Sequence, residues 1–205
     1  ERGGARLIHE LELRISAGQR IGVIGPNGTG KTSLLLAILG ELEISGGELR
    51  HGLNTKLGYL DQQRSGLDDD RTVFDSLGER GEVESGGLRL DVASYLERFL
   101  FDRREQRVKV GQLSGGERAR VCLAKLLAQK INLILLDEPT NDLDVSTLAA
   151  LETMLTEYTG SAIIVSHDRW FLDRVATSIL AFEGDGKLEL HSGNYSDYRD
   201  RILDR

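Results

Sequence analysis

Cysteine is nearly absent from this sequence, which contains Cys122 and no other. A single cysteine cannot form an internal disulfide, so a disulfide-stapled secreted scaffold is excluded and a reducing compartment is favoured. No apolar run approaches the roughly 18 residues that a membrane-spanning helix needs, and no charged-then-apolar leader opens the chain. We therefore expect a cytoplasmic protein that makes no direct insertion into a membrane.

Positively charged residues are also outnumbered by negatively charged ones. The 205 residues include 26 lysines and arginines against 33 aspartates and glutamates, which gives a formal net charge of −7. This balance excludes a generally basic, sequence-indifferent nucleic-acid binder but permits a local basic face. With 40% hydrophobic residues, the chain can bury one core, with or without a small insertion. It starts at Glu1 rather than methionine and ends in a charged helical pattern, so we expect a piece of a longer protein.

Glycine, by contrast, is abundant, and three of the 24 glycines fall in one short stretch. Residues 25–32 read GPNGTGKT and match the phosphate-binding pattern G-x-x-x-x-G-K-[ST]. The alternation of residues 6–15 predicts a strand, the apolar residues 20–24 predict a buried strand, and residues 31–39 predict a helix. A strand, a glycine loop and a helix in this order aim backbone N–H groups and the helix start at one anion. The alternative is a flexible glycine turn before an ordinary helix.

In the phosphate interpretation, each residue of the loop has a role. The glycines let the backbone approach the phosphates, Lys31 supplies positive charge to the β and γ groups, and the Thr32 hydroxyl holds Mg²⁺. The predicted phosphate-binding residues are Gly25, Pro26, Asn27, Gly28, Thr29, Gly30, Lys31, Thr32 and Ser33.

A second apolar run, residues 133–136, ends in Asp137 and Glu138. It is typical of a parallel strand covered on both faces, whose carboxyl end lies where such folds bind ligands. Asp137 is predicted to reach the metal and Glu138 to orient the water that attacks the γ-phosphorus. Alone, this pattern is better explained as a solvated strand end, but beside the glycine loop it predicts a magnesium site.

Residues 113–118 read LSGGER. Ser114 and Glu117 form a capping box for a helix that is expected to run to about Gln129. The box does not explain Gly115 and Gly116, because consecutive glycines weaken a first turn unless something approaches the backbone closely. The stretch therefore predicts a second phosphate-binding surface.

In this set of motifs the sequence resembles the nucleotide-binding domains of ABC ATPases, whose signature is LSGGE. The resemblance covers nearly the whole chain. The family's other motifs are present in the family's order along the chain. A glutamine loop at residues 59–62 (YLDQ) precedes the signature, and a D-loop at residues 141–144 (NDLD) and a switch at residues 166–168 (SHD) come after it. It implies an α/β fold of the P-loop NTPase class, ABC type, with a mixed sheet core. A single domain would span residues 1–205, with its core in 1–62 and 112–205 and a small helical subdomain inserted at 63–111.

The resemblance also implies a mechanism, in which two such domains meet head to tail around ATP and Mg²⁺. Ser114, Gly115, Gly116 and Glu117 of one domain would contact nucleotide held by its partner, and Asp144 would link the two sites. Gln62 and His167 would join Lys31 and Glu138 in catalysis, and the metal would be held by Thr32, Gln62 and Asp137. The implied activity is a Mg-dependent ATPase that is inactive as an isolated monomer.

Within residues 63–111, helical patterns occur near 72–78 and 91–101, with a polar turn expected at 81–87. Residues 68–70 (DDD) are predicted to be a solvated loop rather than a metal site. A basic cluster follows, which is explained as a solvated face or as a contact with a phosphate backbone; it consists of Arg103, Arg104, Arg107 and Lys109.

Three strings resemble the soluble ABC-F class, and within it the Uup-like bacterial members: PTNDLD at 139–144, SHDRWFL at 166–172 and SGNYSDY at 192–198. This class carries two ABC domains in one chain and is associated with translation. Because no extended arm is evident, the resemblance favours the second domain. It implies a second ABC domain as partner, in the same chain or as a homodimer, and the ribosome or RNA in preference to DNA.

Two other functions stay open, the ATPase subunit of a membrane transporter and a non-catalytic ABC scaffold. The intact motif residues argue against the scaffold. One feature departs from the family, which places an adenine-stacking aromatic at or just before Glu1, because no aromatic residue precedes Tyr59.

Overall fold

The computed structural model describes residues 7–9, 11–61, 66–78, 81–85 and 88–204. Its centre is a six-stranded sheet in the order β2 (Leu57–Leu60), β5 (Leu133–Asp137), β6 (Ser161–Val165), β1 (Arg20–Ile24), β7 (Ser178–Gly184) and β8 (Lys187–Ser192). All neighbours pair in parallel except β7 and β8, which form an antiparallel edge hairpin. The predicted mixed sheet of an α/β fold is therefore confirmed.

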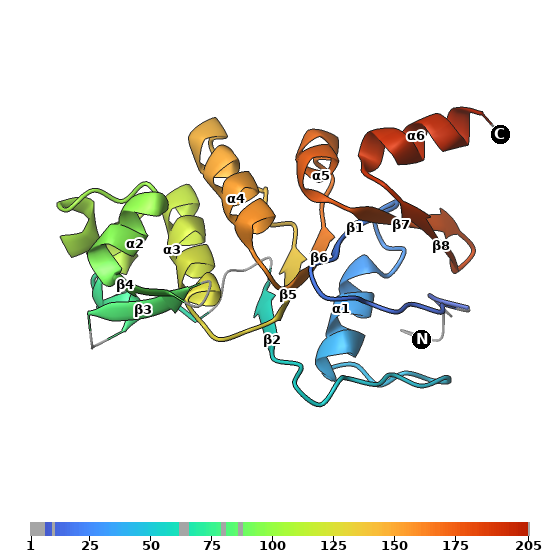
Figure 1. Ribbon diagram of the computed structural model, residues 1–205, viewed down its shortest axis with the longest axis horizontal. Coiled ribbons are helices and arrows are strands. Elements are labelled where there is room, and N and C mark those ends of the chain that lie inside the picture. Colours follow the sequence, from blue (N-terminus) through green and yellow to red (C-terminus); the bar gives the residue numbers. More distant parts are fainter. Residues whose placement is uncertain (1–6, 10, 62–65, 79–80, 86–87, 205) are drawn as a thin grey trace.

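The sheet is covered on both faces (Figure 1). Helix α1 (Lys31–Leu39) packs on one face with Leu133 and Leu135 of β5. Helices α3 (Gly115–Leu127), α4 (Val145–Glu157) and α5 (Arg169–Val175) lie on the other face, where Ile134 and Leu136 point. Coverage from both sides explains why β5 is a continuous apolar run, buried at every position.

The helices of this second face begin at polar residues that bond their first turn. Ser114 and Glu117 form the predicted capping box of α3, Asp144 caps α4, and Asp168 caps α5. The last helix, α6 (Tyr195–Leu203), begins at a capping box made by Asn194 and Asp197. Polar caps thus fix where these four helices start.

The chain between β2 and α3 forms a lobe at the left of Figure 1, whose buried side chains pack against α3. It holds an antiparallel hairpin of β3 (Glu82–Ser85) and β4 (Leu88–Asp91), helix α2 (Val92–Arg98), and three-residue 3₁₀ turns at Asp75–Leu77, Glu105–Arg107 and Val110–Gln112. We call this lobe the inserted segment.

Two predictions for the inserted segment are wrong in detail. Residues 82–85 are a strand rather than part of a polar turn, because buried Val83 pairs with Leu90 across the hairpin. The helical pattern at 72–78 yields only the 3₁₀ turn, whereas the pattern at 91–101 yields α2.

The strand predicted at 6–15 is not formed by the residues of this stretch that the structure describes. Its apolar side chains Ile8, Leu11, Leu13 and Ile15 instead pack against the α1 side of the core. The alternation therefore reflects burial of one side of an extended chain rather than a ladder. Among the described residues, no helix is both long and apolar enough to cross a membrane.

Candidate functional site

The glycine loop connects β1 to α1, and its shape depends on residues without a side chain. Gly25 has φ 149°, and a Cβ atom there would lie 2.6 Å from the Phe182 Cβ on β7. Gly30 has φ 107° and immediately precedes α1. Either position would be strained by any other residue.

Helix α1 begins without a capping side chain. The first N–H groups of a helix lack intrahelical partners, and the helix dipole adds positive potential at the same place. Thr29, the one loop residue with a hydroxyl, donates instead to the Pro26 carbonyl at 2.9 Å. The helix start is thereby left available to an anion.

Lys31 folds into the loop that precedes it. Its Nζ donates to the carbonyl oxygens of Gly25 at 2.8 Å and Pro26 at 2.9 Å. Burial lowers the pKa of Lys31, while the negative charges of Glu138 and Asp137 oppose this shift. The cation is therefore held at the mouth of the loop, within electrostatic reach of both carboxylates of β5.

Asp137 is the last residue of β5 and is buried. Burial raises the pKa of Asp137, whereas a hydrogen bond from the Thr32 side chain and the charge of Lys31 act to lower it. A hydroxyl and a carboxylate in contact form an oxygen donor set of the kind that Mg²⁺ prefers. The residues present therefore suit a magnesium ion.

Glu138 is the next residue along the chain, and its backbone is in the left-handed conformation with φ 50°. Its backbone N–H donates to the Val165 carbonyl at 2.9 Å, which joins the ends of β5 and β6. Its carboxylate accepts from the His167 backbone N–H at 3.3 Å and lies 3.3 Å from His167 Nε2. Burial raises the pKa of Glu138, and His167 opposes that shift.

The left-handed backbone of Glu138 costs on the order of 1–3 kcal/mol, which contacts with the surrounding structure must offset. One such support was not identified from the sequence, a hydrogen bond of 3.0 Å between the hydroxyls of Thr140 and Ser166. It ties the loop after β5 to the loop after β6, and so holds Glu138 beside His167. The only sequence signal for it is that both hydroxyl residues fall inside motifs.

The signature residues occupy a different place, the start of α3. Ser114 Oγ donates to Glu117 Oε2 at 2.7 Å, and the Ser114 N–H donates to the same oxygen at 2.7 Å. A Cβ atom on Gly116 would lie 3.1 Å from the Asp142 carbonyl, whereas one on Gly115 would meet nothing within 4 Å. The signature thus packs against the D-loop of its own chain.

The other predicted site residues are placed as follows. Pro26, Asn27, Gly28 and Thr32 are exposed, and Ser33 is buried in α1. Asp144 accepts from the Thr147 N–H at 2.8 Å, and hydrogen bonds from Ser146 and Thr147 lower its pKa to about 2. Gln62 and the expected position of the adenine-stacking aromatic lie outside the described residues.

The glycine loop, the uncapped helix and the paired carboxylates on β5 define a nucleotide-binding domain of the P-loop class. Within that class, the chain belongs to the ABC transporter family, whose model matches residues 8–141. The ABC-type fold predicted from the motifs is confirmed.

Comparison with individual curated relatives narrows the similarity to one class within the family. The chain is 43% identical over 198 residues to the ATP-binding protein Uup-like of Haemophilus influenzae, with 96% of this chain and 43% of the relative covered. It is 44% identical over 199 residues to the energy-dependent translational throttle protein EttA of Escherichia coli K12, with 97% and 36% covered. The chain thus spans less than half of each relative's length. The resemblance to Uup-like, ABC-F-type proteins is confirmed.

A solved structure shows the same fold. A metal-chelate-type ABC transporter in an inward-facing conformation superposes with a TM-score of 0.70 at 20% identity, over 93% of this chain and 77% of that one.

Proposed function

We propose that this chain is a single ABC domain that binds ATP with Mg²⁺ and hydrolyses ATP to ADP and phosphate. The observation that carries the proposal is the convergence of Lys31, Asp137, Glu138 and His167 at one end of three adjacent strands. A phosphoryl group beside Lys31 would therefore also lie near the carboxylate that can activate water.

Each residue has a distinct role in this proposal. The loop N–H groups and the start of α1 bind the phosphates, and Lys31 leaves its carbonyl partners to neutralise their charge. Glu138 accepts a proton from, or orients, the attacking water, and His167 holds the carboxylate in place. Gln62 is assigned to the metal and the attacking water by the family resemblance.

Mg²⁺ would be held by Thr32 and Asp137 and would supply charge neutralisation for the β- and γ-phosphate oxygens. The hydrogen bond between the Thr32 and Asp137 side chains brings their oxygens close together in the absence of an ion. Thr32 is exposed and Asp137 is buried, so the pair spans the boundary between the loop and the core.

The signature is proposed to act on a second ABC domain, in the same chain or in a homodimer. Ser114 to Glu117 begin a separate helix, and the start of that helix is proposed to bind phosphate once the nucleotide of the second domain replaces the capping contacts. Asp144, one loop away, is proposed to transmit the state of one site to the other through Asp142 and Gly116. A lone domain would then bind ATP but hardly turn it over.

Phosphate release by the 205-residue chain at increasing protein concentration tests this pairing. We expect little turnover per chain in dilute solution, a rise as copies associate, and nucleotide binding at every concentration. Turnover per chain that is already maximal in dilute solution would contradict a shared site.

The client is proposed to be the translation apparatus, in the cytoplasm. The support is similarity to a relative whose name describes an energy-dependent translational throttle. A function as the ATPase subunit of a membrane transporter is less well supported. The transporter structure is only 20% identical, so it is evidence for the fold alone.

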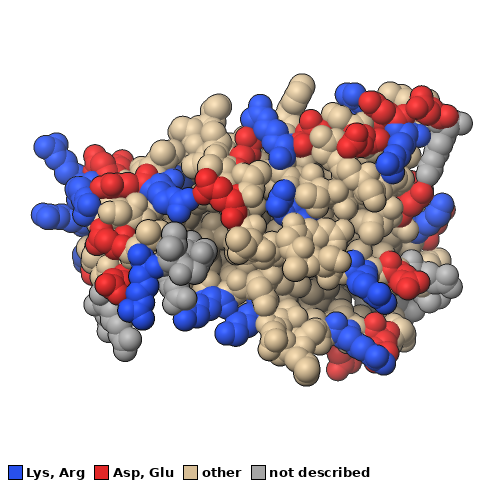
Figure 2. Space-filling model, in the orientation of Figure 1, with Lys and Arg blue, Asp and Glu red and all other residues tan. Residues whose placement is uncertain are grey.

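The inserted segment is the place where contact with ribosomal RNA is proposed. Figure 2 shows lysine and arginine side chains protruding at that end of the molecule, interspersed with acidic ones. In the basic cluster, Arg103 pairs with Glu97 at 2.8 Å and Lys109 with Asp70 at 3.4 Å. Such exposed pairs contribute little to stability, so these cations can exchange partners for phosphates.

A further inference from the structure

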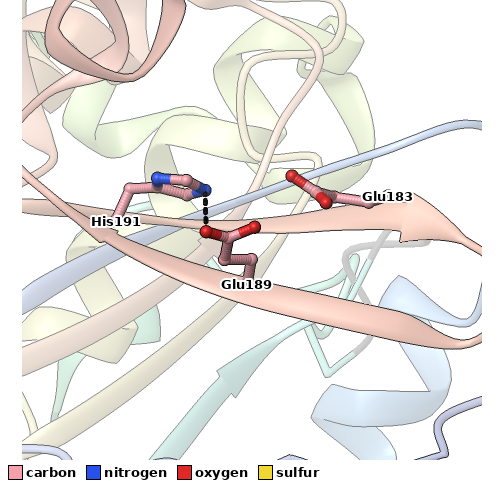
Figure 3. A group of neighbouring side chains, drawn as sticks. All are labelled: Glu183, Glu189 and His191. Atoms are coloured by element: carbon pink, nitrogen blue, oxygen red, sulfur yellow. Dashed lines mark ion pairs between the residues drawn. The ribbon is translucent and has the colours of Figure 1, made fainter. Parts of the chain in front are cut away.

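The edge hairpin of β7 and β8 gathers three side chains that no part of the nucleotide site uses. Glu183 lies on β7, and Glu189 and His191 lie on β8, two residues apart on one face. One potential ligand atom from each lies within 4.8 Å of the others. Figure 3 shows the two carboxylates and the imidazole directed toward a common space.

His191 is the informative member, because it is only 4% exposed. Its Nε2 is one of two buried side-chain nitrogens in the described part of the chain that have no hydrogen-bond partner. Glu189 Oε1 lies 3.9 Å from Nε2, which is beyond hydrogen-bond range. A buried polar atom without a partner is rare in folded proteins and calls for a ligand, a water or an ion.

The ring is also held in place. His191 packs edge-on against Tyr198 of α6, with 4.9 Å between the ring centroids. The orientation of Nε2 is therefore set by packing, and adjustment to an ion would come from the two glutamates. Their side chains are partly exposed and have three rotatable bonds, so they can close around an ion.

We propose that Glu183, Glu189 and His191 form a binding site for a divalent transition-metal ion of the Zn²⁺ class. Imidazole nitrogen combined with carboxylate oxygens is a donor set for Zn²⁺ and its neighbours, whereas Mg²⁺ and Ca²⁺ take oxygen ligands almost exclusively. Three protein ligands leave further positions for water. The site is separate from the proposed Mg²⁺ site and does not depend on the proposed ATPase function.

The ion would brace the edge of the sheet. It would join β7 to β8 and, through His191 and Tyr198, fasten α6 to the hairpin. Glu183 directly follows Phe182, the side chain that lies against Gly25 of the glycine loop. Metal binding should therefore raise the unfolding temperature without being required for nucleotide binding.

Lys187 provides a sharp internal test. Its Nζ lies 3.7 Å from Glu183 Oε2, so its charge competes with any cation for that carboxylate. Removing the charge in Lys187→Gln should tighten metal binding several-fold. A purely structural hairpin contact would show no such gain.

The experiment is a Co²⁺ titration of the full-length protein, stripped with chelator and free of nucleotide, followed by visible absorption and displaced by Zn²⁺. We expect one Co²⁺ that Glu189→Gln and His191→Gln weaken by at least tenfold and Lys187→Gln strengthens. The control is His51→Gln, which removes an exposed histidine outside the hairpin and should change nothing.

Circular dichroism establishes that each variant is folded. If His191→Gln does not fold, Glu189→Gln decides the result, because Glu189 is a partly exposed side chain. Co²⁺ affinity equal in wild type and Glu189→Gln, or absence of Co²⁺ binding in the wild type, would overturn the proposal.

Discussion

Replacing Glu138 by glutamine removes one charge and almost no volume. The glutamine oxygen can still accept from the His167 N–H, a contact of 3.3 Å in the wild type. What is lost is the carboxylate that would take up the proton of the attacking water. General-base catalysis typically contributes about 100- to 10,000-fold, and this range corresponds to about 2.7–5.4 kcal/mol in the activation free energy.

We therefore expect Glu138→Gln to bind ATP with near wild-type affinity and to hydrolyse it about 100- to 10,000-fold more slowly in single-turnover phosphate release. The stalled protein should accumulate as a persistent ATP-bound pair of domains, measurable by size-exclusion chromatography. The matched control is Glu157→Gln, which changes an exposed glutamate that pairs with Arg98. Wild-type turnover by Glu138→Gln would refute the role assigned to this carboxylate.

The pH dependence gives an independent check on the same residue. Burial raises the pKa of Glu138 above its ordinary value, so the ionised fraction falls as the pH drops toward that raised pKa. Wild-type hydrolysis should therefore show an acid limb above about pH 4.3, the ordinary glutamate value. The residual rate of Glu138→Gln should lack this limb.

Three further predictions concern the loop, the D-loop and the signature. Lys31→Ala should weaken ATP binding about 10- to 100-fold in equilibrium dialysis, because a charged hydrogen bond contributes about 1.5–3 kcal/mol, and unchanged affinity would contradict the phosphate role. Asp144→Ala should lower the melting temperature at pH 7. Because the folded pKa of Asp144 is depressed to about 2, this difference should shrink as the pH falls from about 4 toward 2. A difference that is constant with pH would count against the cap. Gly115→Ala, whose Cβ meets nothing within 4 Å, should raise the free energy of unfolding by up to about 1 kcal/mol. It should nevertheless slow the paired ATPase, and unchanged turnover would remove the signature backbone from the site.

The elements that the sequence predicts well are those in which one pattern serves one purpose. The apolar run at β5 is too short for a typical helix and therefore favours a buried strand, and the glycine loop fixes both the end of β1 and the start of α1. The capping box at Ser114 sets the start of α3 in the same way. In each case the local signal and the tertiary fold require the same residues.

Other elements are predicted poorly from the sequence, because their patterns are ambiguous unless the segment that pairs with them is known. Residues 6–15 alternate because one side is buried, yet the described residues there form no strand. Residues 82–85 look like a turn until β4 supplies a partner. Alternation states which side is buried, and pairing depends on a second segment.

Within the site, residue types were predictable and their contacts were not. The inward fold of Lys31 onto its own loop and the left-handed backbone of Glu138 arise from the surrounding structure. The cluster at Glu189 and His191 had only the signal of two polar residues at strand spacing, which becomes meaningful once Glu183 lies across the hairpin.

In the proposed function, ATP binding to this domain controls attachment to the translation apparatus. The most direct measurement is co-sedimentation of Glu138→Gln, in the full-length protein, with purified ribosomes and separately with membranes, with and without ATP. We expect association with ribosomes that requires ATP and is abolished by adding Lys31→Ala. Association with membranes but not ribosomes would contradict it and favour the transporter subunit, and ribosome binding independent of ATP would contradict nucleotide control.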